Sequence, residues 1–374
     1  MAGIYIHIPF CKQACNYCNF YFTTSPRLRE AFVQALLREI EYRKDFLEGE
    51  KVETIYFGGG TPTHLPVNDL LAITESIFKH FSCSISEFTI EANPDDLTAD
   101  KLKNIAQLKQ LGLNRFSIGV QSFFDADLHY MHRAHSAAEA KDAIKRTQDA
   151  GFELITLDLI YGTPTLGHAE WAKNLETVAA LQVPHFSSYA LTVEENTSLF
   201  QKIKKKRLLP VDEEKAAVQF DMLMQFAAQN NFEHYEISNF AKPGKQAIHN
   251  SNYWKGKHYI GFGPSAHSFK RYERSWNAAN LKTYIEQLAK GELNLEFEQL
   301  SPIQHANELV MTALRTSQGL DLNCETIAPY KAFILAQLEQ VNSAFFCFEE
   351  DTIKLTQSGK HFADSVALGL WIEE

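Results

Sequence analysis

A regular alternation of short β-rich runs and helical stretches constrains the fold more than any other feature of the sequence. The β-rich runs are residues 4–9, 53–57, 87–91, 115–120, 154–161 and 185–191. Stretches with helical periodicity lie between them, at about 27–47, 67–81, 98–111, 136–150 and 168–181. This alternation predicts parallel strands joined by right-handed crossover helices. Because the unusual motifs follow strand ends, where barrels gather their chemistry, we predict an α/β fold with a partial (β/α)6 barrel. The periodicity alone also fits a doubly wound sheet.

The sequence after the sixth run suggests two further parts. A helix at about 212–230 completes a barrel domain over residues 1–230, and a motif-dense connecting region follows over 231–295. Residues 296–374 read as helix, turn, helix, a hairpin-like FFCFEEDTIKLT and a final helix. We predict a small C-terminal helical module of the winged-helix kind.

Composition narrows the class of protein. The chain has 374 residues, is 45% apolar and carries a net charge of −10, which argues against a nucleic-acid partner. The start MAGIYIHIPF has neither the charged region nor the cleavage site of a signal peptide, and no apolar run would span a bilayer. Three cysteines, Cys83, Cys324 and Cys347, show no pairing pattern. We therefore expect a cytoplasmic protein with no transmembrane anchor.

Three other cysteines stand close together after the first β-rich run. Cys11, Cys15 and Cys18 read C-x-x-x-C-x-x-C. Thiolates select zinc, copper(I) or iron–sulfur clusters over hard cations. Structural zinc would need a fourth ligand, and the nearby candidate, His7, lies inside the apolar run. A cubane cluster takes one cysteine per iron, so three ligands leave one iron open to an exogenous ligand. Three ordinary buried thiols are the bland alternative.

Polar and glycine-rich motifs follow the next strands. The second run ends in Gly58-Gly59-Gly60-Thr61-Pro62, which lets backbone groups approach a ligand closely. The third β-rich run ends in Glu91, and the fourth is followed by Gln121, with Arg133 further along the chain. The fifth run carries Asp158 among apolar residues. A carboxylate can hold an ammonium group, arginine a carboxylate, and Asp and Gln a ribose diol. Singly, each of these residues also has an ordinary structural explanation.

The motifs YIHIPFCKQACNYCNF, GGGTP, EANP, GVQS and DLIYGTP resemble the radical S-adenosylmethionine (radical SAM) superfamily, in the branch of oxygen-independent coproporphyrinogen III oxidase. The resemblance extends over nearly the whole chain. It implies a 4Fe-4S cluster held by Cys11, Cys15 and Cys18, with S-adenosylmethionine chelating the open iron. It implies S-adenosylmethionine contacts from Tyr5, Gly59, Gly60, Thr61, Glu91, Gln121, Arg133 and Asp158, with Ile160 and Ala190 near the adenine. It leaves open whether one or two S-adenosylmethionine molecules bind.

Two departures weaken the oxidase interpretation. The oxidases carry a further cysteine two residues after the third, where this chain has Phe20. They also have a long extension before the cysteine loop, whereas the first cysteine here is already residue 11. Oxidative decarboxylation of coproporphyrinogen III is therefore our alternative prediction, and no catalytic residue is assigned.

The element His249-Asn250-Ser251-Asn252-Tyr253-Trp254, together with Phe20, resembles the heme chaperone (HemW) branch of the family. A neutral imidazole can ligate heme iron, and Tyr253 and Trp254 offer flat faces to a porphyrin. The resemblance implies a heme-binding motif that includes His249, Asn250, Tyr253 and Trp254, with His249 as its key residue. His258 and His267 are nearby competitors for iron.

The sequence thus predicts a heme chaperone that carries a 4Fe-4S cluster and S-adenosylmethionine, binds heme and passes it to acceptor hemoproteins. The resemblance points to membrane-bound respiratory enzymes as one class of acceptor. Any contact with the membrane would then come through the client protein and not through an anchor of this chain. A homodimer is left open.

Overall fold

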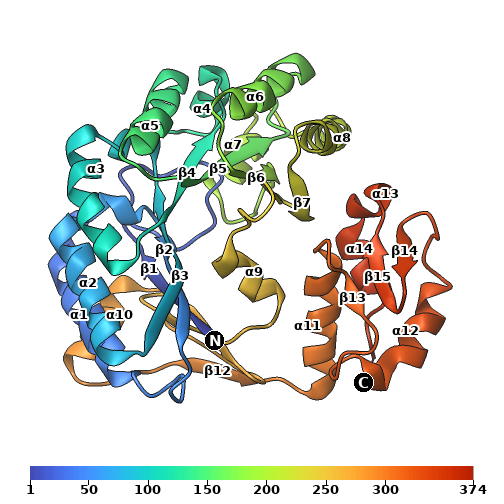
Figure 1. Cartoon of the computed structure of the whole chain (residues 1–374). Coiled ribbons are helices and arrows are strands. Elements are labelled where there is room, and N and C mark those ends of the chain that lie inside the picture. Colours follow the sequence, from blue (N-terminus) through green and yellow to red (C-terminus); the bar gives the residue numbers. More distant parts are fainter. Residues whose placement is uncertain (374) are drawn as a thin grey trace.

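The computed structural model describes residues 1–373, whose centre is a twelve-stranded sheet ordered β12-β11-β10-β9-β1-β2-β3-β4-β5-β6-β8-β7 (Figure 1). The strands from β1 to β6 are Ala2–Ile8, Val52–Gly59, Cys83–Ala92, Arg115–Gln121, Leu154–Tyr161 and His185–Ala190. They are parallel to one another, which confirms the predicted α/β core. Within residues 1–373 the strand order is linear, so the barrel is partial.

Helices cover the outer face of these parallel strands (Figure 1). They are α1 (Arg29–Tyr42), α2 (Val67–His80), α3 (Ala99–Ile105), α5 (Ala137–Asp149), α6 (His168–Ala180) and α8 (Glu213–Gln229). Two short helices, α4 (Asp125–Tyr130) and α7 (Ser198–Lys204), pack together in a separate apolar cluster, and the Leu199 amide of α7 donates to the Asn16 carbonyl in the loop after β1 at 2.8 Å. The Thr98 side chain accepts a hydrogen bond from the Lys101 amide, and Ser136 forms a capping box with Glu139, as N-cap residues do. Ser25 does not cap through its side chain, because Pro26–Leu28 is a separate 3₁₀ turn and α1 begins after it.

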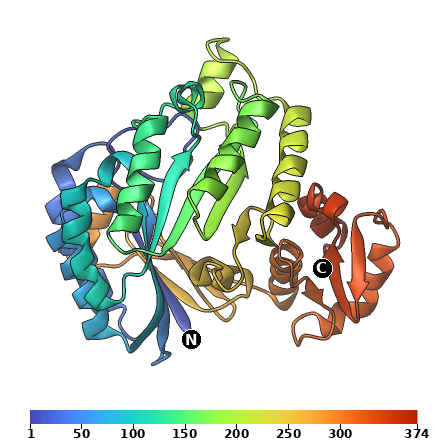
Figure 2. The ribbon, with the colours of Figure 1, turned by 45° about the horizontal axis from the view of Figure 1, so that its top comes forward.

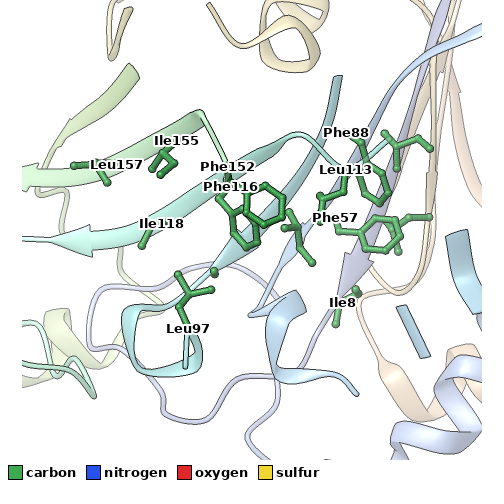
Figure 3. Packing of buried hydrophobic residues seen from close by; sticks show 14 of the residues in the cluster. Ile8, Phe57, Phe88, Leu97, Leu113, Phe116, Ile118, Phe152, Ile155 and Leu157 are labelled. Carbon is green, nitrogen blue, oxygen red and sulfur yellow. The ribbon is translucent and has the colours of Figure 1, made fainter. Parts of the chain in front are cut away.

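The core lies between the sheet and these helices. Ile4, Ile6 and Ile8 are fully buried on the helix-facing side of β1, as period-2 alternation requires. Figure 3 shows the continuing row of apolar side chains, with Phe57 and Phe88 in contact and Phe116 against Phe152. The opposite side chains of the parallel strands, such as Tyr5 and Asp158, therefore face the concave side of the sheet.

Both ends of the sheet carry short strands that the sequence analysis did not predict. At one end they are β9 (Tyr259–Phe262), β10 (His267–Lys270), β11 (Glu273–Trp276) and β12 (Glu296–Gln299); at the other, β7 (Glu233–Glu236) and β8 (Asn239–Ala241). Strand β9 is parallel to β1, whereas β10, β11 and β12 are antiparallel to their neighbours. Strands of three or four residues carry too little periodicity to be recognised in a sequence.

A buried carboxylate fastens the β9–β10 edge to helix α1. Glu39, which is fully buried, accepts hydrogen bonds from Arg43 Nη1 at 2.9 Å and from the Gly263 amide at 2.8 Å. Asn277 and Tyr284 donate to the same carboxylate at 2.8 and 2.7 Å. Arg43 in turn donates to the Gly261 carbonyl at 2.7 Å. A charge buried this way persists only when its hydrogen bonds are complete, so the network fixes where β9 and β10 lie.

The C-terminal residues form a second apolar core. Helix α10 (Leu281–Ala289) precedes β12, and then come α11 (Pro302–Leu314), β13 (Leu320–Asp321), α12 (Lys331–Leu338), β14 (Phe346–Glu349), β15 (Thr352–Leu355), α13 (Gln357–Lys360) and α14 (Ala363–Gly369). This order of helix, short strand, helix and hairpin is that of the predicted winged-helix-like module, which Figure 2 shows beside the open side of the sheet. The Ile237 amide donates to the Arg315 carbonyl at 3.0 Å and joins this part to the end of β7. Within the described residues, no helix is both long and apolar enough to cross a membrane.

Candidate functional site

The three cysteines lie on the loop that follows β1, at the carboxyl end of the parallel strands. A backbone pairing closes this loop, with the Cys11 amide donating to the Thr23 carbonyl at 3.0 Å and the Thr23 amide to the Pro9 carbonyl at 2.7 Å. The glycine-rich loop after β2 pairs with its beginning, since the Thr61 amide donates to the Phe10 carbonyl at 2.8 Å. The loops after β1 and β2 thus lie edge to edge.

The glycines of GGGTP are required by this close packing. Gly59 has φ +106°, and a Cβ there would lie 2.6 Å from the His7 ring. A Cβ at Gly60 would lie 2.8 Å from the Phe10 carbonyl oxygen. A side chain at either position would push the two loops apart. The glycine run therefore sets the position of the cysteine loop in addition to exposing its backbone to a ligand.

Arg133 connects the loops that follow four different strands. Its Nη2 donates to Asn93 Oδ1 and to the Gly119 carbonyl, both at 2.6 Å, and its Nη1 approaches Cys15 Sγ at 3.3 Å. Asn93 donates to Thr61 Oγ1 at 2.9 Å, and the Thr61 hydroxyl approaches Cys11 Sγ at 3.7 Å. The half-buried guanidinium thus places positive charge beside the thiols, where thiolates of a bound cluster would need it.

The thiols fit a cluster better than a single ion. Among the described residues, no three His, Cys, Asp or Glu side chains gather closely enough to hold one metal ion. Cys11, Cys15 and Cys18 are all partly exposed on the same loop, and a cubane needs its thiolates spread over separate irons. Burial raises the pKa of Cys11 to about 12 and raises that of Cys18, so these groups are neutral thiols until a metal binds.

Two half-buried carboxylates lie behind the loops on the concave side of the sheet. Glu91, at the end of β3, accepts from Tyr56 Oη at 2.8 Å and from the Gly59 amide at 3.1 Å. Asp158 in β5 accepts from Ser117 Oγ at 3.0 Å. Burial raises the pKa of Glu91 to about 7 and that of Asp158 to about 6. Such a pair favours a ligand that carries positive charge.

The remaining residues of the predicted S-adenosylmethionine site surround the same end of the sheet. Gln121 ends β4 in the left-handed region, with φ +67°, which is uncommon for a residue other than glycine and often marks a functional constraint. Tyr5 stacks on Tyr56 with ring centroids 6.1 Å apart. Ile160 is buried near the end of β5, while Ala190 is exposed at the end of β6.

The HNSNYW element forms helix α9 (Ile248–Trp254), which packs against the concave side of the sheet, where the His249 ring stacks on Tyr56 with centroids 5.1 Å apart. Glu87, early in β3, accepts from the His249 amide at 2.9 Å and is held by an ion pair to Arg115 at 2.8 Å. Since Thr54, which also contacts His249, precedes Gly59 by five residues of β2, α9 lies about 16 Å from the glycine loop at the strand rise of about 3.3 Å per residue. The helix therefore covers the amino-terminal end of the strands.

His249 is enclosed in this position. It is 2% exposed, its Nδ1 lies 2.8 Å from Thr54 Oγ1, and its Nε2 lies 2.9 Å from Tyr253 Oη. Burial lowers the pKa of His249 to about 3, so the ring is neutral. Asn250 is half-buried, and Tyr253 and Trp254 line a cavity beside the helix. Ligation of heme by His249 stays a prediction, and it would require one of these two ring contacts to be given up to the iron.

Several residues of the site were missed in the sequence analysis. Asn93 and Tyr17 contact Arg133, Tyr56 and Ser117 hold the two carboxylates, and Glu87 and Arg115 hold α9. Alternation along the strands could have identified Ser117, since it precedes Gly119 by one strand period on the face of the sheet that carries the site. The others depend on contacts between distant segments.

Comparisons with known proteins agree on the family. Residues 5–178 match the model of the radical SAM superfamily. A protein of Bacillus subtilis named heme chaperone HemW is 37% identical over 327 residues, covering 86% of this chain and 85% of that protein. A heme chaperone HemW of Mycobacterium tuberculosis is 31% identical over 97% of this chain and 93% of its own length. The solved structure of coproporphyrinogen III oxidase (HemN) from Escherichia coli superimposes with a TM-score of 0.85 at 22% identity, covering 99% of this chain and 90% of the other, which shows the shared fold.

Replacement of Cys11 by serine should prevent cluster assembly, because serine oxygen is a poor substitute for a soft thiolate ligand. We expect the anaerobically reconstituted Cys11→Ser variant to lose the visible absorbance and most of the bound iron and sulfide. Cys83→Ser, which changes a cysteine outside the loop, is the matched control and should keep both. Full iron and sulfide in Cys11→Ser would contradict the cluster assignment.

Replacement of Glu91 by glutamine should change how stability depends on pH. Because burial raises the folded-state pKa of Glu91 from 4.5 to about 7, the folded state binds more protons than the unfolded state in this interval. Its contribution to stability is therefore present below pH 4.5 and is lost as the pH rises through 7. We expect the free energy of unfolding of ligand-free Glu91→Gln, measured with urea, to fall less steeply between pH 5 and 8 than that of the wild type. Glu75→Gln, which changes an exposed carboxylate, is the control and should show the pH dependence of the wild type. If the free energy of unfolding of Glu91→Gln had the same pH dependence as that of the wild type, the raised pKa of Glu91 would be contradicted.

Proposed function

Because this chain belongs to the HemW family within the radical SAM superfamily, we propose that it is a heme chaperone that binds heme and transfers it to acceptor hemoproteins. The observation that carries the proposal is identity of 31–37% over most of the chain with proteins named heme chaperone HemW. The HNSNYW element supports it independently, because Tyr253 and Trp254 present aromatic faces to a cavity.

Two resident cofactors accompany this function in the proposal. Membership in the radical SAM superfamily implies a 4Fe-4S cluster and S-adenosylmethionine. Cys11, Cys15 and Cys18 would hold the cluster, which, when bound, can supply an electron for cleavage of the sulfonium bond of S-adenosylmethionine. The chain's own part is to place the Arg133 guanidinium beside Cys15 and the Thr61 hydroxyl beside Cys11. Both groups point a hydrogen-bond donor at the sulfur of their neighbour.

S-adenosylmethionine would bind on the concave side of the sheet beside the cysteine loop. The half-buried pair Glu91 and Asp158 would favour its positively charged ammonium and sulfonium groups. Backbone groups of Gly59, Gly60 and Thr61 would contact the methionine moiety, as the resemblance implies. Arg133 Nε is buried without a hydrogen-bond partner in the described residues and so remains available to the ligand's carboxylate. Tyr5, Gln121, Ile160 and Ala190 would complete the site.

The clients would be hemoproteins that acquire heme after they are made, including respiratory enzymes of a membrane, and the chaperone would reach them from the cytoplasm. The support for such clients is the relationship to proteins named heme chaperone HemW. The oxidase alternative gains no specific support: the superposition on the oxidase shows the fold, and Phe20, whose side chain is 73% exposed, occupies the position of the additional cysteine.

An anaerobic heme titration followed by transfer tests the proposal. We expect saturable binding of about one heme per chain, followed by appearance of the spectrum of a reconstituted hemoprotein when an apo-hemoprotein is added to the loaded chain. Free heme at the same concentration serves as the control for transfer through solution. Two results together would contradict the chaperone function and support the oxidase function. They are weak, nonsaturating binding of heme, and decarboxylation of coproporphyrinogen in the presence of S-adenosylmethionine and a reductant.

A further inference from the structure

A large aromatic cavity lies between the open edge of the sheet and the C-terminal module. Its volume is about 560 Å³, within the range of roughly 300–1,000 Å³ typical of small-molecule sites. Five segments enclose it: strand β1 with Tyr5 and His7, the cysteine loop at residues 19–21, the end of α9, the strands β9 to β11, and helix α11. Neither the S-adenosylmethionine carboxylates nor His249 belongs to its lining.

The strand register explains which side chains form one wall. Tyr259, Phe269 and Arg274 occupy one row across β9, β10 and β11, next to Gly3 of β1. His267 and Trp276 occupy the next row, in line with Tyr5. Residues in register share a face of a sheet, and Gly3 and Tyr5 face the concave side. This wall is therefore the continuation of the concave face beyond β1.

Helix α11 supplies the opposite wall. The lining residues His305, Glu308, Leu309 and Thr312 are spaced i, i+3, i+4 and i+7, which places them on one side of the helix. Arg274 joins the two walls through an ion pair with Glu308 at 2.8 Å. Arg274 Nε and His305 Nδ1 are buried without a hydrogen-bond partner in residues 1–373. Buried polar atoms of this kind are normally satisfied by a bound ligand or water.

The lining matches the chemistry of a metalloporphyrin. Tyr253, Trp254, Tyr259 and Phe269 provide flat apolar faces for a macrocycle. Arg274 provides the cation that a propionate requires. The remaining requirement is a neutral imidazole with a free ring nitrogen.

His267 meets that requirement better than His249. Its ring stacks on Trp276 with centroids 5.6 Å apart, and its side chain is exposed toward the cavity. It makes no side-chain hydrogen bond among the described residues, whereas both nitrogens of His249 are occupied. Burial and the neighbouring Arg274 lower the pKa of His267, which favours the neutral form of the ring. His305 also lines the cavity, but it lies against Tyr272, at the end remote from the cysteine loop.

We propose that heme binds in this cavity with His267 as an axial ligand of the iron and with Arg274 beside a propionate. The inference rests on the proposed function and adds the place and the ligand. His249 then acts as a positioning residue, because its hydrogen bond to Tyr253 Oη, at 2.9 Å, orients one aromatic wall.

The test compares ferric heme spectra and affinities of His267→Ala, His249→Ala and His305→Ala with those of the wild type. We expect His267→Ala to shift the absorbance and electron paramagnetic resonance signals of the iron and to weaken binding by about tenfold or more. Added imidazole should restore the wild-type signals, since it can enter the vacated space. His258→Ala, a histidine paired with Glu50 outside the cavity, is the matched control and should change neither.

The outcomes separate this inference from the proposed function. His249→Ala should weaken binding while it preserves the signals of the wild-type iron, as a positioning role requires. Saturable binding with unchanged signals in His267→Ala, or loss of the signals in His305→Ala or His249→Ala alone, would overturn the assignment of His267 and leave the chaperone intact. Absence of saturable heme binding in the wild type would remove the proposed function itself. Imidazole rescue and an unchanged circular dichroism spectrum distinguish a lost ligand from a misfolded variant.

Discussion

The pairing of strand β1 on both of its edges is the constraint on which the rest of the structure depends. β1 is parallel to β2 on one side and to β9 on the other, so it joins the predicted barrel to the β9–β11 wall. Its alternating side chains divide the molecule, because Ile4 and Ile6 enter the helix-covered core while Tyr5 and His7 face the concave side. The loop that carries the cysteines begins where this strand ends.

The cysteine loop and the proposed heme cavity share this strand as a boundary. His7 Nε2 lies 2.9 Å from the Tyr21 carbonyl, and both residues line the cavity. Asn19 and Phe20, which follow Cys18, contribute to the same lining. The conformation of this loop therefore affects both the cysteine site and the proposed heme cavity. Glu39 secures the other side, since its hydrogen bonds with Arg43 and the Gly263 amide hold β9 and β10 against α1.

The sequence predicted those parts of the molecule that depend on local pattern. The six parallel strands and the helix–hairpin order of the C-terminal module follow from periodicity and short motifs. The motifs at strand ends could be brought together because carboxyl ends of parallel strands meet at one edge. Asp158 stood out as a carboxylate among apolar residues that needs a partner if buried, and it accepts a hydrogen bond from Ser117 Oγ at 3.0 Å.

The parts that could not be predicted depend on contacts between distant segments. The environment of His249 is set by Thr54 and by the Glu87–Arg115 pair, which lie more than a hundred residues away in the sequence. The wall with His267 is built from four-residue strands whose register only the folded sheet defines. His249 belongs to a recognisable motif and His267 to an ordinary strand. Which of the two is better placed to bind iron depends on the groups that surround each ring.

Location of the iron in the heme-loaded protein would test the central claim most directly. Anomalous scattering measured on both sides of the iron absorption edge in crystals grown anaerobically with heme would place the cluster irons and the heme iron separately. We predict a single iron within coordination distance of His267, between the β10 wall and helix α11, apart from the irons beside Cys11, Cys15 and Cys18. A heme iron on His249 beneath the barrel, or one outside the cavity, would contradict it.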